Sequence, residues 1–254
     1  MSYINLNTIY NEDNIITLNR MDDNFLDLTV TSPPYNVNLG KNKYNKTSYD
    51  LYIDNKDHKE YIEWLKNTFQ LVYQKTKSGG RCAINIGDGK NGSVPTHSDI
   101  IQMMINIKWI PMGIILWDKN NVSNRTAWGS FKSPSSPSFP TPFEYILIFA
   151  KESKKLQWNG KTDLTKEEFI NWAFSKWSFN GENLKKVGHP AAFPIELPLR
   201  IIKMLSWVNS IVYDPYIGSG TTAIACVKTN RYFIGSEISK EYVKLSYERI
   251  KNEV

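Results

Sequence analysis

The chain alternates short apolar runs with longer stretches in which apolar residues recur at helical spacing. In residues 58–76, for example, Tyr61, Leu65 and Phe69 share one helical face. The other stretches with helical character are residues 14–19, 97–105, 194–207, 220–228 and 240–251. The short apolar runs, which are typical of strands, are residues 8–10, 26–31, 81–86, 210–213 and 231–237. Strands that alternate with helices predict an α/β fold with a mostly parallel sheet.

Two longer apolar runs, residues 109–117 and 144–150, predict a pair of antiparallel strands at a sheet edge. The segment between them is rich in Asn, Ser and Pro and is too long for a plain connection. Residues 151–188 are polar, contain several tryptophans and show weak periodicity, so we expect an inserted region that faces the substrate. Gly79 and Gly80 are expected to close the helix that precedes the strand at 81–86.

Length and composition limit the class of protein. The 254 residues are 41% hydrophobic and fit a single domain, 1–254, with a sizeable insertion. The net charge of +6 favours a polyanionic partner without establishing one. Cys82 and Cys226 are far apart and form no CxxC pair, so no disulfide framework and no metal site are expected. A polar start and the lack of a long apolar run lead us to expect a cytoplasmic protein without a membrane segment.

The most informative motif, Ser32-Pro33-Pro34-Tyr35, directly follows the predicted strand that ends at Thr31. Proline fixes φ and restricts the residue before it, so the loop is nearly rigid. The carbonyls of Ser32 and Pro33 are then fixed acceptors beside an aromatic ring. That arrangement suits a planar group with an amino function, such as a nucleobase.

A second motif, Asp214-Pro215-Tyr216-Ile217-Gly218-Ser219-Gly220-Thr221-Thr222, joins a predicted strand to a predicted helix. The carboxyl ends of strands are where open α/β sheets bind ligands, and a helix N-terminus offers unpaired N–H groups. The spacing is neither that of a dinucleotide fingerprint nor that of a P-loop. Glu237, at the end of the next predicted strand, is placed to accept hydrogen bonds from ribose hydroxyls.

Together the two motifs resemble those of the S-adenosylmethionine-dependent DNA amino-methyltransferases of restriction–modification systems. The catalytic motif of that family, (D/N/S)-P-P-(Y/F), is similar to residues 32–35, and its cofactor motif, DPFxGSGTT, is similar to residues 214–222, with Tyr216 in place of Phe. The catalytic motif comes first, which is the circularly permuted order of the β class. Related protein-glutamine and RNA methyltransferases normally carry the cofactor motif first. The resemblance implies a Rossmann-like methyltransferase fold and S-adenosyl-L-methionine as cofactor.

The resemblance also implies which residues bind that cofactor. Asp13 is expected to contact the adenine amino group, and it is equally a candidate helix N-cap. Phe193 is expected beside the methionine moiety. The rest of the expected set is Thr31, Asp214, Tyr216, Gly218, Ser219, Gly220, Thr221, Thr222 and Glu237.

The implied reaction is methyl transfer to the exocyclic amino group of a flipped base. Tyr35 would stack on the base, while Ser32 Oγ and the Pro33 carbonyl would accept the two amino hydrogens; Pro34 completes the catalytic set. No cysteine nucleophile is needed, and both cysteines are interpreted as core residues.

DNA contacts are expected from a loop at 37–57, which carries Lys41, Lys43 and Lys46, and from Arg125 and Trp128. Trp128 either stacks on a base or simply packs, and the basic loop is also consistent with a solvated surface loop. The expected partner is double-stranded DNA. The resemblance further implies a homodimer and a cognate restriction endonuclease as possible partners.

Two alternatives stay open. Ser at the first motif position is commoner in cytosine-N4 enzymes of the family and Asp in adenine-N6 enzymes, so Ser32 favours cytosine, with adenine as the alternative. A catalytically silent DNA-binding regulatory module would keep the fold, but it has no reason to retain both motifs intact.

Overall fold

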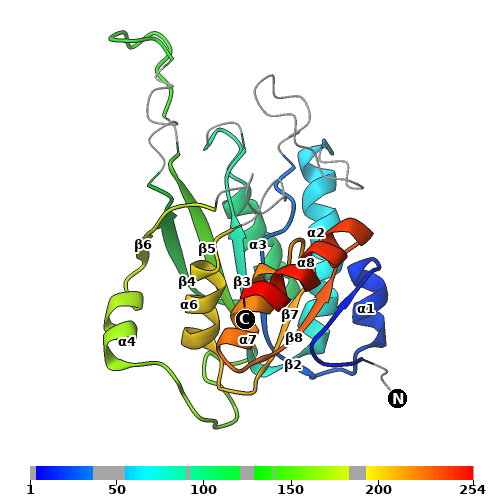
Figure 1. Ribbon diagram of the computed structural model, residues 1–254. Helices are drawn as coiled ribbons and strands as arrows, with labels where there is room; N and C mark the ends of the chain where they lie inside the picture. The colour runs from blue at the N-terminus through cyan, green and yellow to red at the C-terminus, as the bar shows by residue number, and fades with distance from the viewer. Residues whose placement is uncertain are drawn as a thin grey trace.

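The computed structural model describes residues 4–36, 55–89, 92–120, 129–139, 141–182 and 193–253 (Figure 1). Its strands are β1 (Thr8–Tyr10), β2 (Leu26–Thr31), β3 (Thr76–Ile86), β4 (Trp109–Asp118), β5 (Phe143–Lys151), β6 (Lys176–Ser178), β7 (Ile211–Asp214) and β8 (Tyr232–Ser236). Its helices are α1 (Asn14–Arg20), α2 (His58–Lys75), α3 (Thr96–Ile107), α4 (Lys166–Trp172), α6 (Glu196–Leu205), α7 (Thr221–Lys228) and α8 (Lys240–Glu253).

All eight of these strands form one sheet in the order β1-β8-β7-β2-β3-β5-β4-β6. Neighbouring strands are parallel except at β5, which runs antiparallel to both β3 and β4. The two motif-bearing strands, β2 and β7, lie side by side, with Leu28 opposite Val212 and Thr29 opposite Tyr213. Their carboxyl ends therefore meet at one edge of the sheet, although the motifs are far apart in sequence.

Helices cover both faces of the sheet, so the molecule has three layers (Figure 1). One core cluster joins the apolar faces of α1, α2 and α3 to sheet residues such as Ile84. The other joins α6, α7 and part of α4 to residues such as Ala83 on the opposite face. Because successive strand residues point to opposite faces, Ala83 and Ile84 belong to different clusters. Every residue of β2 is buried, as expected for a central strand covered on both sides.

The predicted α/β fold, the mostly parallel sheet and the antiparallel pair are confirmed. Both cysteines are buried in the core, also as predicted. The expected role of Gly79 and Gly80 is wrong. The helix ends at Lys75, where the Thr76 side chain donates to the Val72 carbonyl at 2.7 Å, and both glycines lie inside β3.

A β-bulge explains this difference. The register against β2 shifts between Leu26, paired with Thr76, and Leu28, paired with Arg81. The extra residues on β3 include Gly79, whose φ of 78° favours glycine, and a Cβ there would lie 2.5 Å from the Lys155 carbonyl oxygen. The glycines therefore relieve a close backbone approach within a strand.

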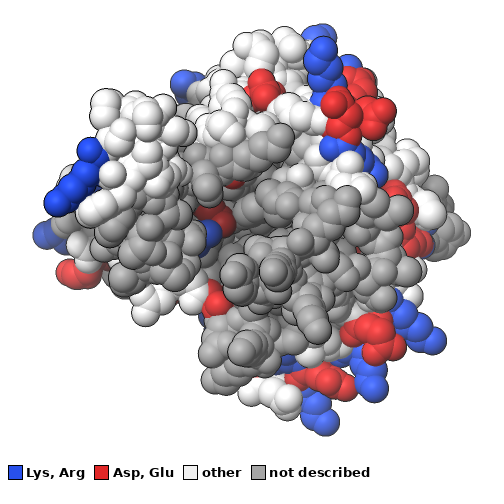
Figure 2. All heavy atoms as spheres, turned by 90° about the horizontal axis from the view of Figure 1, so that it is seen from above, with Lys and Arg blue, Asp and Glu red and all other residues white. Residues whose placement is uncertain are grey.

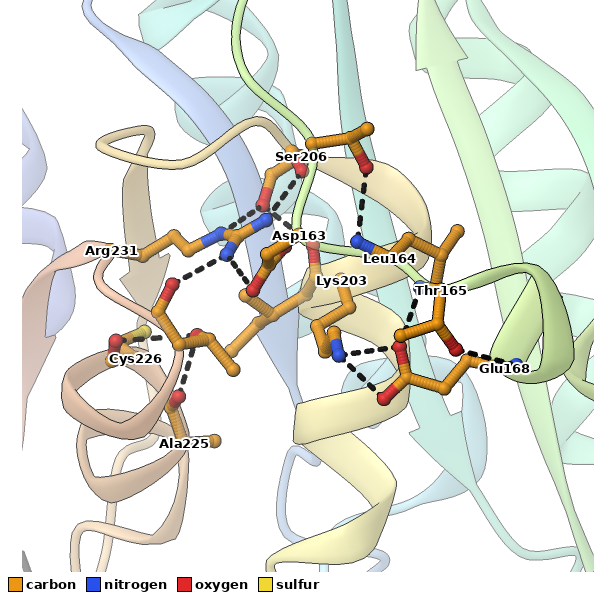
Figure 3. Close-up of polar contacts among 12 residues, drawn as sticks. Asp163, Leu164, Thr165, Glu168, Lys203, Ser206, Ala225, Cys226 and Arg231 are labelled. Carbon is orange, nitrogen blue, oxygen red and sulfur yellow. Dashed lines mark hydrogen bonds and ion pairs between the residues drawn. The ribbon is translucent and has the colours of Figure 1, made fainter.

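The described part of the predicted insertion, residues 151–182, is held on the body of the protein by polar contacts (Figure 3). Arg231, whose side chain is fully buried, pairs with Asp163 at 2.7 Å and donates to the Ser206 carbonyl at 2.8 Å. Lys203 of α6 pairs with Glu168 of α4 at 2.5 Å. These contacts fix α4 beside α6, and β6 then adds a short strand outside β4.

Two tryptophans of this region, Trp172 and Trp177, are buried in the second core cluster. They are packing residues of the fold. Across the residues that the structure describes, no helix is long and apolar enough to cross a membrane.

Candidate active site

Asp214 joins the two sequence motifs at the carboxyl ends of β2 and β7. Its Oδ1 accepts from Thr31 Oγ1 at 2.6 Å and from the Tyr216 N–H at 3.0 Å, and its Oδ2 accepts from Thr222 Oγ1 at 2.6 Å. The side chain is buried, with 1% of the residue exposed. Asp214 thus fixes the end of the catalytic strand against the turn of the second motif.

Burial raises the pKa of Asp214 to about 6, although the three hydrogen bonds that it accepts oppose the rise. Groups of the protein itself occupy three of the about four acceptor positions of this buried carboxylate. The structure therefore assigns the carboxylate of Asp214 to the internal connection between the motifs.

The turn at residues 218–220 leads into α7 and is fixed from behind by α8. Arg249 of α8 is buried and donates to the Ser219 carbonyl and Oγ, both at 2.9 Å, and to Thr221 Oγ1 at 3.1 Å. The side chains of Ser219 and Thr221 therefore face Arg249. Gly220 has a φ of 81°, and a Cβ there would lie 2.6 Å from Ser246 Cβ of α8. Glycine is required both by the backbone conformation and by the close packing of α8.

Glu237 lies directly after β8, beside this turn. Its Oε2 accepts from the Gly218 N–H at 3.0 Å and its Oε1 from the Ser239 N–H at 2.8 Å. A carboxylate has about four acceptor positions, so acceptor capacity is left for a ligand hydroxyl. Burial raises the pKa of Glu237 above its ordinary value, against the opposing effect of its N–H donors.

Asp13 is the N-cap of α1, where its Oδ1 accepts from the Ile15 N–H at 2.8 Å. The helix is positioned against the second motif through Asn14, which donates to the Pro215 carbonyl at 3.4 Å and accepts from Thr68 Oγ1 at 3.2 Å. Thr68 also lies 3.0 Å from the Tyr216 hydroxyl. The hydroxyl that distinguishes Tyr216 from the family's Phe thus has a partner on α2.

The catalytic motif follows β2 at the same edge of the sheet. Pro33 is buried and Ser32 and Tyr35 are half-buried. Tyr61 of α2 donates from its hydroxyl to the Pro34 carbonyl at 2.7 Å, which holds the loop against the helix. A Cβ at Gly87 would lie 3.3 Å from Tyr35 Cε2, so glycine leaves room for the Tyr35 ring. Phe193 is half-buried and packs against the second core cluster.

Two residues that sequence reasoning did not place in the site, Asn85 and Glu144, meet the motif from other strands, together with Lys119. Asn85 of β3 donates from Nδ2 to the Tyr35 hydroxyl and to Glu144 Oε2, both at 2.7 Å. Glu144 of β5 accepts from the Tyr35 hydroxyl at 2.8 Å and from Lys119 Nζ at 2.6 Å. They have no common sequence motif; the available signal was their position, because Asn85 lies near the end of a predicted strand and Lys119 and Glu144 flank the predicted edge pair.

The expected DNA contacts Lys41, Lys43, Lys46, Arg125 and Trp128 lie outside the described residues. The described ends of that basic segment are joined by the Asn36 side chain. It donates to the Lys56 carbonyl at 2.8 Å and accepts from the Lys56 N–H at 2.8 Å. Figure 2 looks onto this end of the molecule and shows a hollowed surface with acidic and basic side chains inside it. No cluster of three or more His, Cys, Asp or Glu side chains that would hold a metal ion occurs within the described ranges.

Comparison with known proteins agrees with this geometry. A sequence model of the DNA methylase family with N6 and N4 specificity matches residues 26–248. The chain is 37% identical over 190 residues to the Type II methyltransferase M.MjaVI of Methanocaldococcus jannaschii, covering 70% of this chain and 93% of that protein. It is 31% identical over 265 residues to the Type II methyltransferase M.BglII of Bacillus subtilis, covering 98% of this chain and 70% of that protein.

Among solved structures, TTHA0409 of Thermus thermophilus in complex with S-adenosyl-L-methionine superposes with a TM-score of 0.76 at 26% identity, covering 97% of this chain and 93% of that one. The chain belongs to the N6/N4 family of DNA methylases. It is an S-adenosylmethionine-dependent DNA methyltransferase, as the resemblance of its two motifs predicted.

Proposed function

We propose that this methyltransferase modifies the N4 amino group of cytosine within a specific sequence of double-stranded DNA, with the target base flipped out of the duplex. The observation that carries the proposal is the position of Ser32-Pro33-Pro34-Tyr35. This motif stands at the carboxyl end of β2 and is tied to the second motif through Thr31 and Asp214. The base itself is argued from Ser32, since serine at this position is commoner in the cytosine-N4 enzymes of the family.

The residues at the ends of β7 and β8 fit the cofactor. Glu237 offers free acceptor positions to the ribose hydroxyls, and Asp13 and Phe193 are proposed to flank the adenine and the methionine moiety. No described side chain caps α7, so its first N–H groups are available to a carboxylate. Since Arg249 occupies the side chains of Ser219 and Thr221, we propose that this turn contributes its backbone.

S-adenosylmethionine, when bound, supplies an electrophilic methyl group. The work of the protein is then to present the amino nitrogen, whose lone pair is delocalised into the ring. Tyr35 stacks on the base, worth about 1–3 kcal/mol for a base on an aromatic ring. Ser32 Oγ and the Pro33 carbonyl accept the two amino hydrogens, which orients the nitrogen lone pair and stabilises the positive charge that develops on nitrogen. No described residue donates a hydrogen bond to the Pro33 carbonyl.

Several features of the wider protein are proposed on the same basis. The motif order supports the permuted β class, and residues 151–188 are proposed to contribute to target recognition. The names of M.MjaVI and M.BglII as Type II methyltransferases support a restriction–modification system with a cognate endonuclease. A homodimer stays a prediction from the family alone.

Analysis of the modified nucleosides tests the function directly. DNA from a host that expresses the chain is digested to nucleosides and examined by mass spectrometry, with a Ser32→Ala variant in the same host as control. We expect N4-methyldeoxycytidine only with the unaltered chain, and mapping of the modified positions gives the recognition sequence. N6-methyldeoxyadenosine in its place would overturn the choice of base, and the absence of both would overturn methylation of DNA amino groups.

A further inference from the structure

A chain of hydrogen bonds runs from the catalytic serine to a charged residue on a different strand. Ser32 Oγ donates to the Tyr35 hydroxyl at 3.1 Å, and the Tyr35 hydroxyl donates to Glu144 Oε2 at 2.8 Å. We call these three groups the hydroxyl chain. Glu144 is 9% exposed and Asn85, which borders the chain, is 1% exposed, so water has little access to its inner end.

The charge of Glu144 decides the direction of every bond in the hydroxyl chain. Lys119 Nζ lies 2.6 Å from Glu144 Oε1, an ion pair that stabilises the carboxylate. A carboxylate only accepts hydrogen bonds, so Tyr35 must donate its one hydroxyl proton to Glu144. The Tyr35 oxygen can then only accept, and it does so from Ser32 and from Asn85 Nδ2 at 2.7 Å.

These bond directions determine which atoms Ser32 presents to the substrate. Its single hydroxyl proton is committed to Tyr35, so the lone pairs of Oγ are what it presents to the substrate. Asn85 supports this polarity because its Nδ2 approaches the Tyr35 hydroxyl, Glu144 Oε2 and, at 3.5 Å, Ser32 Oγ. All three partners are oxygens. An amide oxygen in the place of Nδ2 would therefore form weaker contacts with them or be repelled by them.

We propose that Glu144 is a positioning residue that acts through the Tyr35 hydroxyl and makes Ser32 Oγ an obligatory hydrogen-bond acceptor for the amino group of the target base. This inference rests on the proposed function. The amino group of a base acts only as a hydrogen-bond donor in the plane of the ring, whereas a free serine hydroxyl donates as readily as it accepts. An ionised carboxylate in the place of Ser32 could only accept. A serine needs the hydroxyl chain to do the same, and its acceptor strength rises because consecutive hydrogen bonds polarise one another.

Glu144→Gln tests the direction of the chain at nearly constant shape. Lys119 requires an oxygen, so the new amide turns its NH2 group toward Tyr35, loses the bond that Oε2 accepts from Asn85 Nδ2, and reverses the chain. Ser32 then directs a hydrogen at the amino group. We expect the single-turnover methylation rate at saturating DNA and cofactor to fall about 10- to 100-fold, the range for losing a charge-assisted hydrogen bond. The dissociation constants for DNA and S-adenosylmethionine should stay within about threefold of the wild-type values, since Glu144 is proposed to act only through Tyr35.

Tyr35→Phe removes the same connection from its middle and keeps the aromatic ring for stacking. It should lower the single-turnover rate by a similar factor, again with little effect on either dissociation constant. The double variant Tyr35→Phe/Glu144→Gln should be no slower than the slower single variant, because each change already disconnects Ser32 from the carboxylate. Glu63→Gln, on an exposed carboxylate of α2, is the matched control and should keep the wild-type rate.

Unchanged rates in both single variants would overturn the inference, and so would losses that multiply in the double variant. If Glu144→Gln fails to give a wild-type melting curve, Tyr35→Phe decides alone, because it deletes one hydroxyl. If the wild-type protein methylates DNA and both variants match its rate, only the role of Glu144 is refuted. If the wild-type protein methylates no DNA, the proposed function itself is refuted.

Discussion

Asp214 is the residue whose ionisation is most clearly tied to the fold. Burial raises its pKa from the ordinary 3.8 to about 6. Between these values the folded protein keeps a proton that the unfolded chain loses. The contribution of Asp214 to the free energy of unfolding is therefore fully present below about pH 4. It falls as the pH rises to about 6 and is constant above that. At about 1.4 kcal/mol per pKa unit, the fall amounts to about 3 kcal/mol.

Asp214→Asn should remove this pH dependence. Asparagine has nearly the same shape, and the hydroxyls of Thr31 and Thr222 can turn to match its oxygen and its NH2 group. Urea unfolding between about pH 4 and pH 7 should show a wild-type free energy of unfolding that falls relative to the variant. Glu237, whose pKa is also raised, is present in both proteins, but part of that rise comes from the Asp214 charge, so the difference includes this coupling. Parallel curves would show that Asp214 does not titrate in this range.

Individual residues of the site differ in how far the sequence predicts them. Ser32 and Glu237 were predicted to stand at strand ends because each follows an apolar run, and the structure places them there. Asn85, Lys119 and Glu144 were not predicted as a group, because they come from β3, the end of β4 and β5. Only the antiparallel pairing of β5 with both neighbours brings the three side chains to Tyr35.

At the scale of elements, the packing of α8 against the turn before α7 depends on one glycine. Gly220→Ala forces a Cβ onto a backbone with φ 81° and within 2.6 Å of Ser246 Cβ. We expect a loss of at least about 2 kcal/mol in the free energy of unfolding. Gly113→Ala on β4 is the matched control, since a Cβ there meets nothing within 4 Å, and it should change stability by no more than about 0.5 kcal/mol. Equal losses in urea unfolding would contradict this account.

Element boundaries were predictable where one physical signal acted alone. The strand at Leu26–Thr31 matches its apolar run because it is buried on both sides. The start of β3 was missed, because Gly79 and Gly80 indicate a helix end in sequence. In the structure they lie in a β-bulge against β2, with Gly79 close to the Lys155 backbone, more than 70 residues away. The short strand β6 was also missed, since its pairing with β4 is a tertiary contact with no local pattern.

At the scale of the whole molecule, we expect the net charge of +6 to act on DNA at the end of the sheet that carries both motifs. Lys41, Lys43 and Lys46 follow the catalytic motif in sequence and are predicted to contact phosphates. Changing all three to Gln should weaken DNA binding and reduce the slope of log affinity against log salt by up to about 2.7, at about 0.9 for each phosphate contact.

A second triple variant separates local contact from overall charge. Lys240, Lys244 and Lys251 are exposed on α8, and changing them to Gln also lowers the net charge from +6 to +3. Because long-range attraction between exposed charges is screened by salt, this control should leave the salt slope nearly unchanged. Fluorescence anisotropy of a labelled duplex across a salt series measures both variants. Equal reductions of the slope would mean that the basic character of the chain acts only as a diffuse field, and that the lysines after Tyr35 have no particular place on the DNA.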